Sequence, residues 1–208
     1  MKLGLFGGTF DPPHIGHLRL AEAFYAASDV DLMLIMPSFI PPHKAASATD
    51  ALYRFEMCRA AFAPLGKKGV CYRVDDYEIT RDDTSYTYLT VRHLTEKYGV
   101  DRVNLCVGSD MLMSFERWRN ADELMKKSVL YTMARDGGED AALREHAAYL
   151  RNTFGAEVHI MDVPYTAVSS TGIRAALAAE DGAERGLVDE NIVRYAREHG
   201  LYTAQGLL

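Results

Sequence analysis

Short apolar runs alternate with longer amphipathic segments along most of this chain. The apolar runs predict strands at Leu3–Phe6, Asp31–Met36, Val70–Val74, Val103–Val107, Val129–Met133 and Glu157–Met161. Apolar residues at helical spacing predict helices at about Ile15–Ala27, Asp50–Ala63, Ser85–Tyr98, Ala121–Lys126 and Glu139–Asn152. Strands that alternate with helices are typical of an α/β fold with a doubly wound, mostly parallel sheet. In such a sheet, ligands bind beyond the carboxyl ends of the strands.

The C-terminal part of the chain is expected to be helical. The run Ser169–Thr171 can cap a helix that passes through Ile173. A second helix is expected at about Val188–His199, and Gly200 can end it. Because no linker-like segment separates these helices from the rest, we expect a single domain over residues 1–208, with its helical part at about 169–208.

Composition narrows the possible partners. The 208 residues are 48% hydrophobic, which is ordinary for a globular protein, and the formal net charge of -6 disfavours broad nucleic-acid binding. A small anion can still bind where a few cations gather in a cleft. Cys58, Cys71 and Cys106 form no C-x-x-C pair, so we expect buried free thiols and a cytoplasmic location. We expect no signal peptide and no membrane span, and a monomer and a small homo-oligomer both remain open.

The segment from Gly7 to His17 has the strongest chemical signal. Gly7 and Gly8 follow the first predicted strand, and His14 and His17 stand where a helix begins. Glycines let a backbone approach a ligand closely, and a helix N-terminus favours an anion. The two histidines are three residues apart, so they share a helix face and can both donate hydrogen bonds to phosphate. Singly, these residues read as a tight turn and a helix cap, but together they predict a nucleotide-phosphate site.

A second anion site is predicted at the start of the first C-terminal helix. Hydroxyls and N–H groups of Ser169, Ser170 and Thr171 gather there, and Arg174 follows one turn later. Alone, this pattern is also that of an ordinary cap beside an exposed arginine. The proline-rich loop after the second strand carries His43 and Lys44 to the same edge of the sheet. We expect them to contact phosphate there, although the same residues also fit a surface loop with a solvated lysine.

Other nucleotide and hydrolytic chemistries lack their motifs. The chain has no G-x-x-x-x-G-K-[ST] phosphate loop and no G-x-G-x-x-G after its first strand. H-E-x-x-H and G-x-S-x-G are also missing, which disfavours zinc hydrolysis and a serine nucleophile.

The two motifs carry a family resemblance. His14-Ile15-Gly16-His17 resembles the HxGH signature of the nucleotidylyltransferase superfamily, in the form known from class I aminoacyl-tRNA synthetases. The second motif resembles ISSTxxR, with Val168 in place of the isoleucine. The chain is similar to the bacterial nicotinate-nucleotide adenylyltransferases from its first strand to its last helix. Further family features stand at Gly7–Pro12, Pro41–Lys44, Ser85–Thr87, Gly108–Asp110, Trp118 and Gly200–Tyr202.

The chain departs from the family at one loop. Arg135-Asp136-Gly137-Gly138 stands where the family often has Arg-Pro-Gly, which puts the role of Arg135 in doubt. The related pantetheine-phosphate adenylyltransferases share HxGH, but they are shorter and lack the Pro-Pro-His-Lys loop and the tryptophan.

The resemblance implies a Rossmann-like nucleotidylyltransferase fold that joins ATP and nicotinate mononucleotide into nicotinate adenine dinucleotide, with Mg²⁺ on the ATP phosphates. The implied catalytic residues are His14, His17 and Arg174. The implied ATP-binding residues are Gly7, Gly8, Thr9, Phe10, Gly16, Gly108, Ser169, Ser170, Thr171 and Ile173. The implied acceptor-binding residues are His43, Lys44, Tyr86, Thr87, Asp110, Trp118 and Arg135.

Trp118 has two readings in the sequence. An indole near the ligand end of the sheet can stack on a pyridinium ring, but a core tryptophan fits the pattern equally well. The helix start at Ser85–Thr87 offers N–H groups to a carboxylate, so we expect the acid to be preferred over the amide.

Two other functions compete with this one. A nucleotide-sensing or scaffold protein could keep the fold without turnover, although it would not require His14, His17 and Arg174 together. A relative of the aminoacyl-tRNA synthetases is disfavoured by the short chain and the acidic balance.

Overall fold

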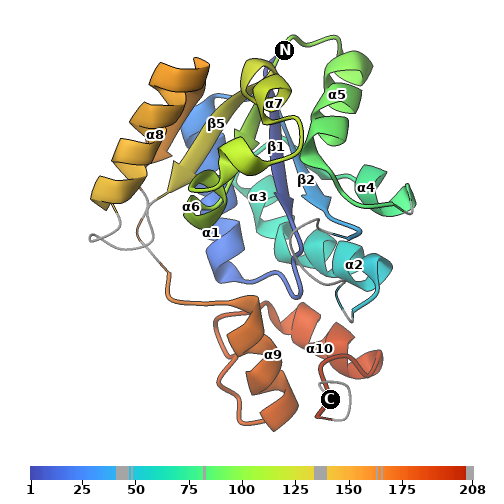
Figure 1. Ribbon diagram of the computed structural model, residues 1–208. Coiled ribbons are helices and arrows are strands. Elements are labelled where there is room, and N and C mark those ends of the chain that lie inside the picture. Colours follow the sequence, from blue (N-terminus) through green and yellow to red (C-terminus); the bar gives the residue numbers. More distant parts are fainter. Residues whose placement is uncertain are drawn as a thin grey trace.

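The computed structural model describes residues 1–40, 47, 49–81, 83–133, 140–162, 164 and 166–204 (Figure 1). Its centre is a six-stranded sheet in the order β3-β2-β1-β4-β5-β6, and every pairing is parallel. The strands are β1 (Leu3–Gly8), β2 (Leu32–Pro37), β3 (Tyr72–Val74), β4 (Val103–Cys106), β5 (Ser128–Met133) and β6 (Glu157–Met161). The strand order reverses between β1 and β4, as in doubly wound nucleotide-binding sheets. The predicted α/β fold class is confirmed.

Helices connect the strands and follow the last one. They are α1 (Ile15–Ser28), α2 (Ala51–Ala61), α3 (Ala63–Lys67), α4 (Tyr77–Thr80), α5 (Thr87–Tyr98), α6 (Ser109–Leu112), α7 (Ala121–Lys127), α8 (Asp140–Phe154), α9 (Ser170–Ala179) and α10 (Glu190–Glu198), with a 3₁₀ turn, η1, at Phe115–Arg117. The five long helices expected between the strands, and both C-terminal helices, are present. The short helices α3, α4 and α6 and the turn η1 were not predicted, because so few residues show no clear helical period.

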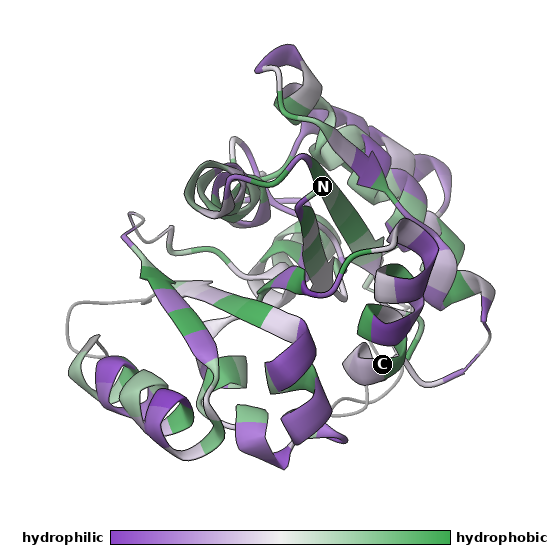
Figure 2. Cartoon of the chain, turned by 90° about the horizontal axis from the view of Figure 1, so that it is seen from above, coloured by the Kyte–Doolittle hydropathy of each residue, from purple (hydrophilic) through white to green (hydrophobic). Residues whose placement is uncertain are grey.

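Both faces of the sheet are buried, and β2 shows how. Met33 and Ile35 pack into the cluster that includes residues of α1, α2, α3 and α10, whereas Leu34 and Met36 pack into the cluster formed with α5, α7 and α8. Parallel strands that are covered on both faces read as continuous apolar runs rather than as alternating patterns. Seen from above, the hydrophobic central strands lie between helices of mixed hydropathy (Figure 2).

The C-terminal helices lie at the end of the sheet toward which β1 points (Figure 1). Ile192 of α10 is fully buried in the hydrophobic cluster that also contains residues of α2. Ile173 of α9 belongs to the same cluster. This placement brings the start of α9 to the carboxyl edge of the sheet.

The cysteines only partly follow the expectation from sequence. All three thiols are free, and Cys58 and Cys106 are buried as predicted. Cys71, however, is exposed because it lies just before β3, the strand at one edge of the sheet. Within the part of the chain that the structure describes, no helix is long and apolar enough to cross a bilayer.

The packing predicts a contrast between two leucines on neighbouring helices. Leu65 of α3 is 0% exposed, whereas Leu52 of α2 is 66% exposed. Replacing Leu65 with alanine removes buried contacts and leaves a cavity, so the free energy of unfolding should fall by about 2–5 kcal/mol. Leu52→Ala should change it by less than about 0.5 kcal/mol. Urea unfolding of both variants measures the difference, and equal losses would contradict the burial of Leu65.

Candidate active site

A cleft of about 1480 Å³ opens at the carboxyl edge of the sheet. Its walls include Gly8 at the end of β1, Ser38 after β2, Val107 after β4 and Met133 at the end of β5. The cleft therefore lies where the strand order reverses, which is the ligand position expected for this architecture.

The two histidines of the first motif lie against one another at the start of α1. His14 is the N-cap of the helix and His17 lies in its first turn, with their rings stacked at 3.7 Å between centroids. The backbone N–H of His14 donates a hydrogen bond to Nδ1 of His17 at 3.2 Å. Because Nδ1 accepts, the ring proton of His17 sits on Nε2, which can donate to a ligand.

His14 is held as a neutral imidazole. It is 8% exposed, and burial lowers its pKa from 6.5 to about 4. Its buried Nδ1 has no hydrogen-bond partner among the described residues. At neutral pH this ring therefore supplies hydrogen bonding without a positive charge.

The start of α1 is less open than the sequence suggested. The N–H of Ile15 donates to the carbonyl of Leu187, in the segment between α9 and α10, at 2.8 Å. The N–H groups of His17 and Leu18 donate to the carbonyl of His14 at 2.9 and 3.2 Å. Part of the expected anion-binding capacity of this helix start is thus used within the protein, and the histidine side chains carry more of it.

The positions of Gly8 and Gly16 have no room for a side chain. A Cβ at Gly16 would lie 2.9 Å from Cγ1 of Val168 and 3.1 Å from the ring of His14. A Cβ at Gly8 would lie 2.8 Å from the ring of Phe10. The Phe10 ring is buried against Phe6.

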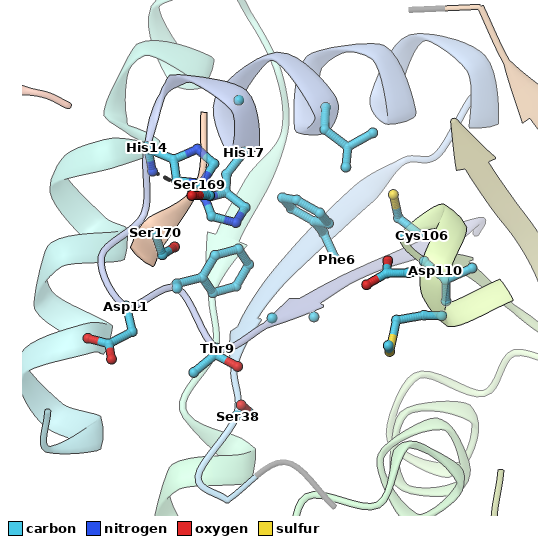
Figure 3. Close-up of a pocket in the computed structure, with 18 of the residues that line it drawn as sticks. Phe6, Thr9, Asp11, His14, His17, Ser38, Cys106, Asp110, Ser169 and Ser170 are labelled. Carbon is cyan, nitrogen blue, oxygen red and sulfur yellow. Dashed lines mark hydrogen bonds between the residues drawn. The ribbon is translucent and has the colours of Figure 1, made fainter. Parts of the chain in front are cut away.

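The two motifs meet through hydrogen bonds between α9 and the loop that follows β1. Oγ of Ser170 donates to the carbonyl of Pro12 at 2.9 Å. Nη1 of Arg174 donates to the carbonyl of Asp11 at 2.6 Å and lies 3.8 Å from its Oδ2. Figure 3 shows Ser169 and Ser170 beside the paired histidines. Asp11 lies on the loop that leads from β1 to His14. Segments about 150 residues apart in the chain thus form one rim of the cleft.

Arg54 supports this rim from below, and sequence reasoning missed it. Its side chain is 1% exposed and donates to the carbonyls of Thr9 at 2.7 Å, Phe39 at 3.2 Å and Thr49 at 3.2 Å. Burial lowers the pKa of this guanidinium, and Asp11 acts in the opposite direction. In the sequence Arg54 looks like any arginine on an amphipathic helix, so no local signal marks it.

Tyr202 supports the rim from the C-terminal side. Its hydroxyl donates to Oδ1 of Asp11 at 2.6 Å, and Oγ of Ser47 donates to Oδ2 at 2.6 Å. Burial, followed by the nearby Asp11 charge, raises the pKa of Tyr202, so the phenol stays protonated and keeps donating. The sequence contained Tyr202 only as the end of a family feature.

The other end of the cleft is built from α5, α6 and the residue after η1. Gly108 is the N-cap of α6 and Asp110 is an exposed residue of its first turn. Trp118 is half-buried, with one face against Phe115 at 4.8 Å between ring centroids, and it also lines the cleft. Trp118 thus contacts Phe115 of the core and also borders the cleft, and its stacking on a pyridinium ring stays a prediction.

The cleft gathers most of the site residues expected from the sequence. Those that line it are Gly7, Gly8, Thr9, Phe10, His14, Gly16, His17, Tyr86, Thr87, Gly108, Asp110, Trp118, Ser169, Ser170, Thr171 and Arg174. Ile173 does not line it: its side chain is 2% exposed in the core and its N–H donates to the carbonyl of Ser169. The structure therefore gives Ile173 a packing role. His43, Lys44 and Arg135 lie outside the described residues.

Comparison with known proteins identifies the family. The family model described as cytidylyltransferase-like matches residues 5–176. The probable nicotinate-nucleotide adenylyltransferase of Exiguobacterium sibiricum is 36% identical over 97% of this chain and 99% of that protein. The chain belongs to the nicotinate-nucleotide adenylyltransferase family. Another such relative, from Oceanobacillus iheyensis, is 31% identical over 97% of this chain and 96% of its own length.

Solved structures agree with this adenylyltransferase fold. Nicotinic acid mononucleotide adenylyltransferase of Plasmodium falciparum, complexed with NaAD, superposes with a TM-score of 0.76 at 15% identity, over 97% of each chain. The same protein complexed with APC gives a TM-score of 0.74 over 97% of this chain and 96% of that one. At this identity the likeness establishes the fold, which is the Rossmann-like nucleotidylyltransferase fold expected from the sequence.

The buried His14 predicts a pH dependence of this adenylyltransferase's stability. Between pH 6.5 and pH 4 the unfolded chain takes up a proton that the folded His14 does not, so stability falls as the pH falls. Between pH 7.5 and pH 5, the wild type should lose up to about 2 kcal/mol more unfolding free energy than His14→Gln. Denaturant unfolding at both pH values measures this, and identical losses in the two proteins would show that His14 is protonated in the fold.

Proposed function

We propose that this chain transfers the adenylyl group of ATP to nicotinate mononucleotide, with release of pyrophosphate, and so forms nicotinate adenine dinucleotide in NAD biosynthesis. The observation that carries the proposal is the meeting of the two motifs. His14, His17 and Arg174 stand at one end of a cleft whose other end is lined by Tyr86 and Trp118.

The phosphates of ATP lie along the rim formed by α1 and α9. The neutral imidazole of His14 and the Nε2 atom of His17 donate hydrogen bonds to the triphosphate, where charge develops on the transferring phosphoryl group. Ser170, Thr171 and Arg174 hold the β and γ phosphates, which depart as pyrophosphate. Gly7, Gly8, Thr9 and Phe10 shape the nucleotide site, where the two glycines let the backbone approach the ligand.

The acceptor's 5′-phosphate attacks the α-phosphorus of ATP in line with the departing pyrophosphate. A phosphate monoester has a second pKa of about 6, so it is largely a dianion at neutral pH and needs no general base from the protein. A phosphorus–oxygen bond to the acceptor forms as the α–β bridge breaks. The protein then contributes positioning and charge stabilisation rather than a covalent intermediate.

The nicotinate ring lies at the other end of the cleft. The open face of Trp118 can stack on the pyridinium, whose charge strengthens the contact. Thr87 begins α5 after the N-cap Tyr86, so N–H groups of this first turn are placed to bind the carboxylate. Asp110 can accept hydrogen bonds from a ribose.

ATP enters as its complex with a divalent cation, and we propose Mg²⁺. In this proposal the ATP phosphates carry the cation, because Mg²⁺ usually keeps several waters and binds substrate phosphates. The contacts between α9 and the loop after β1 also support one domain over residues 1–208, with its helical part at about 169–208.

An acceptor panel tests the proposed reaction. Purified protein with ATP and Mg²⁺ should release pyrophosphate with nicotinate mononucleotide, more slowly with nicotinamide mononucleotide, and not with phosphopantetheine. A site that hydrogen-bonds a carboxylate can reject the amide by up to ~10⁴ in kcat/KM. Turnover with phosphopantetheine alone would assign the chain to the other branch of the superfamily. Nucleotide binding without any turnover would favour a sensor or scaffold.

The histidine pair predicts a large effect on turnover. His17→Ala should lower kcat by at least ~100-fold, because it removes one preorganised donor from the transition state. The matched control is His159→Ala, which removes an exposed histidine of β6 outside the cleft and should leave kcat unchanged. Circular dichroism checks that both variants fold. A folded His17→Ala protein with near-normal kcat would remove this histidine from the mechanism.

A further inference from the structure

Arg119 stands at the acceptor end of the cleft, and no sequence motif pointed to it. It follows Trp118 directly, is exposed, and lines the cleft. Its Cζ lies 4.8 Å from the centroid of the Tyr86 ring, which is a cation–π contact. Because Tyr86 is the N-cap of α5, this contact holds a permanent positive charge beside the start of that helix.

Two carboxylates lie near this helix start. Asp83 attracts Arg119 but is exposed, so water and salt screen its charge. Glu78 is buried and accepts a hydrogen bond from Oγ1 of Thr90 at 2.6 Å. Burial raises the pKa of Glu78 and so disfavours its ionised form. The α5 dipole adds positive potential at its N-terminus. The part of the cleft beside Arg119 and the start of α5 therefore favours an anionic group.

The two candidate acceptors differ in charge at the ring substituent, which is the group expected beside Arg119 and the start of α5. In nicotinate mononucleotide the pyridinium bears a carboxylate, so the ring system has no net charge. In nicotinamide mononucleotide the same pyridinium bears a neutral amide, so the ring system has a net charge of +1. A fixed cation attracts the first and repels the second, whereas a stacking ring contacts both.

We propose that Arg119 is a specificity-determining residue, whose guanidinium favours the acid over the amide at the start of α5. This inference rests on the proposed function and goes beyond it. Trp118 binds the ring that both acceptors share, and Thr87 supplies N–H groups. Arg119 adds a positive charge. This charge favours binding of the carboxylate of the acid and disfavours binding of the amide, whose pyridinium has no neighbouring negative charge.

Two variants of Arg119, and one of its neighbour Arg117 as a control, test this role. In Arg119→Gln, the ratio of kcat/KM for nicotinate mononucleotide to that for nicotinamide mononucleotide should fall about tenfold, the low end for a charge-assisted hydrogen bond because the residue is exposed. The loss should appear as a higher KM for the acid with kcat little changed, since the contact exists before and during the reaction. Arg119→Lys keeps the charge but not the planar group, so its ratio should be intermediate.

Arg117→Gln is the matched control. Arg117 lies in the same turn, is exposed and lines the same cleft, but the contact with the Tyr86 ring belongs to Arg119. Arg117→Gln should keep the wild-type ratio.

Raising the salt concentration should reduce the ratio of the wild type and leave that of Arg119→Gln nearly constant, because mobile ions screen an exposed charge. Thermal unfolding confirms that each variant is folded.

Several results would overturn the inference. An unchanged ratio in folded Arg119→Gln would do so. An equal rise in KM for both acceptors would assign Arg119 to the phosphate or ribose that they share. An equal fall in ratio for Arg117→Gln would replace a specific contact with general charge. A wild type that uses neither acceptor would overturn the proposed function itself, which separates that failure from failure of the inference alone.

Discussion

The architecture of the site depends on satisfying the buried carbonyl groups of one loop. The loop after β1 carries both histidines to the start of α1, and its carbonyls have side-chain donors that come from other elements. The donors are the Arg54 guanidinium for Thr9, the Arg174 guanidinium for Asp11 and the Ser170 hydroxyl for Pro12. An unsatisfied buried carbonyl costs about 1–3 kcal/mol, so the loop cannot hold this shape unless α2 and α9 are in place. Assembly of the site is thereby coupled to completion of the fold.

Asp11 joins the same network through its side chain. Its carboxylate receives the hydroxyls of Tyr202 and Ser47 and lies near Arg174. A buried carboxylate is tolerated only when donors and an opposite charge surround it, and here they come from three different parts of the chain. Arg174 is therefore oriented before any nucleotide binds. Such preorganisation lets a charged group act on a transition state without being rearranged.

Charge and hydrogen bonding are divided between different residues of the rim. His14 is buried and neutral, and His17 accepts through Nδ1, so the imidazoles act as directed donors. Arg174 brings a permanent positive charge to this rim, and Arg19 of α1 also lines the cleft. A local arrangement of this kind explains how a chain with a formal net charge of -6 can present a site for a triphosphate. The one change in the second motif is also compatible with the site, since Val168 packs against Gly16 where the family has isoleucine.

The sequence by itself determined the local features of this protein. Apolar runs and helical periods located all six strands and the long helices, and the motifs around His14 and Arg174 marked the two segments that meet at one rim of the cleft. These features are readable because each depends on residues close together in the chain. The single-turn elements α4 and α6 were missed because they are too short to show a period.

Only the tertiary structure decided how distant segments satisfy one another. The tertiary structure sets the strand order. It pairs the N–H of Ile15 with the carbonyl of Leu187 and buries the side chain of Ile173 in the core. It also brought Arg54 beneath the loop and Arg119 onto Tyr86. No pattern of residues encodes these contacts locally, because a hydrogen-bond or ring partner tens of residues away is chosen by packing. Burial then changes what the side chain does, as it changes His14 from a titrating group into a neutral donor.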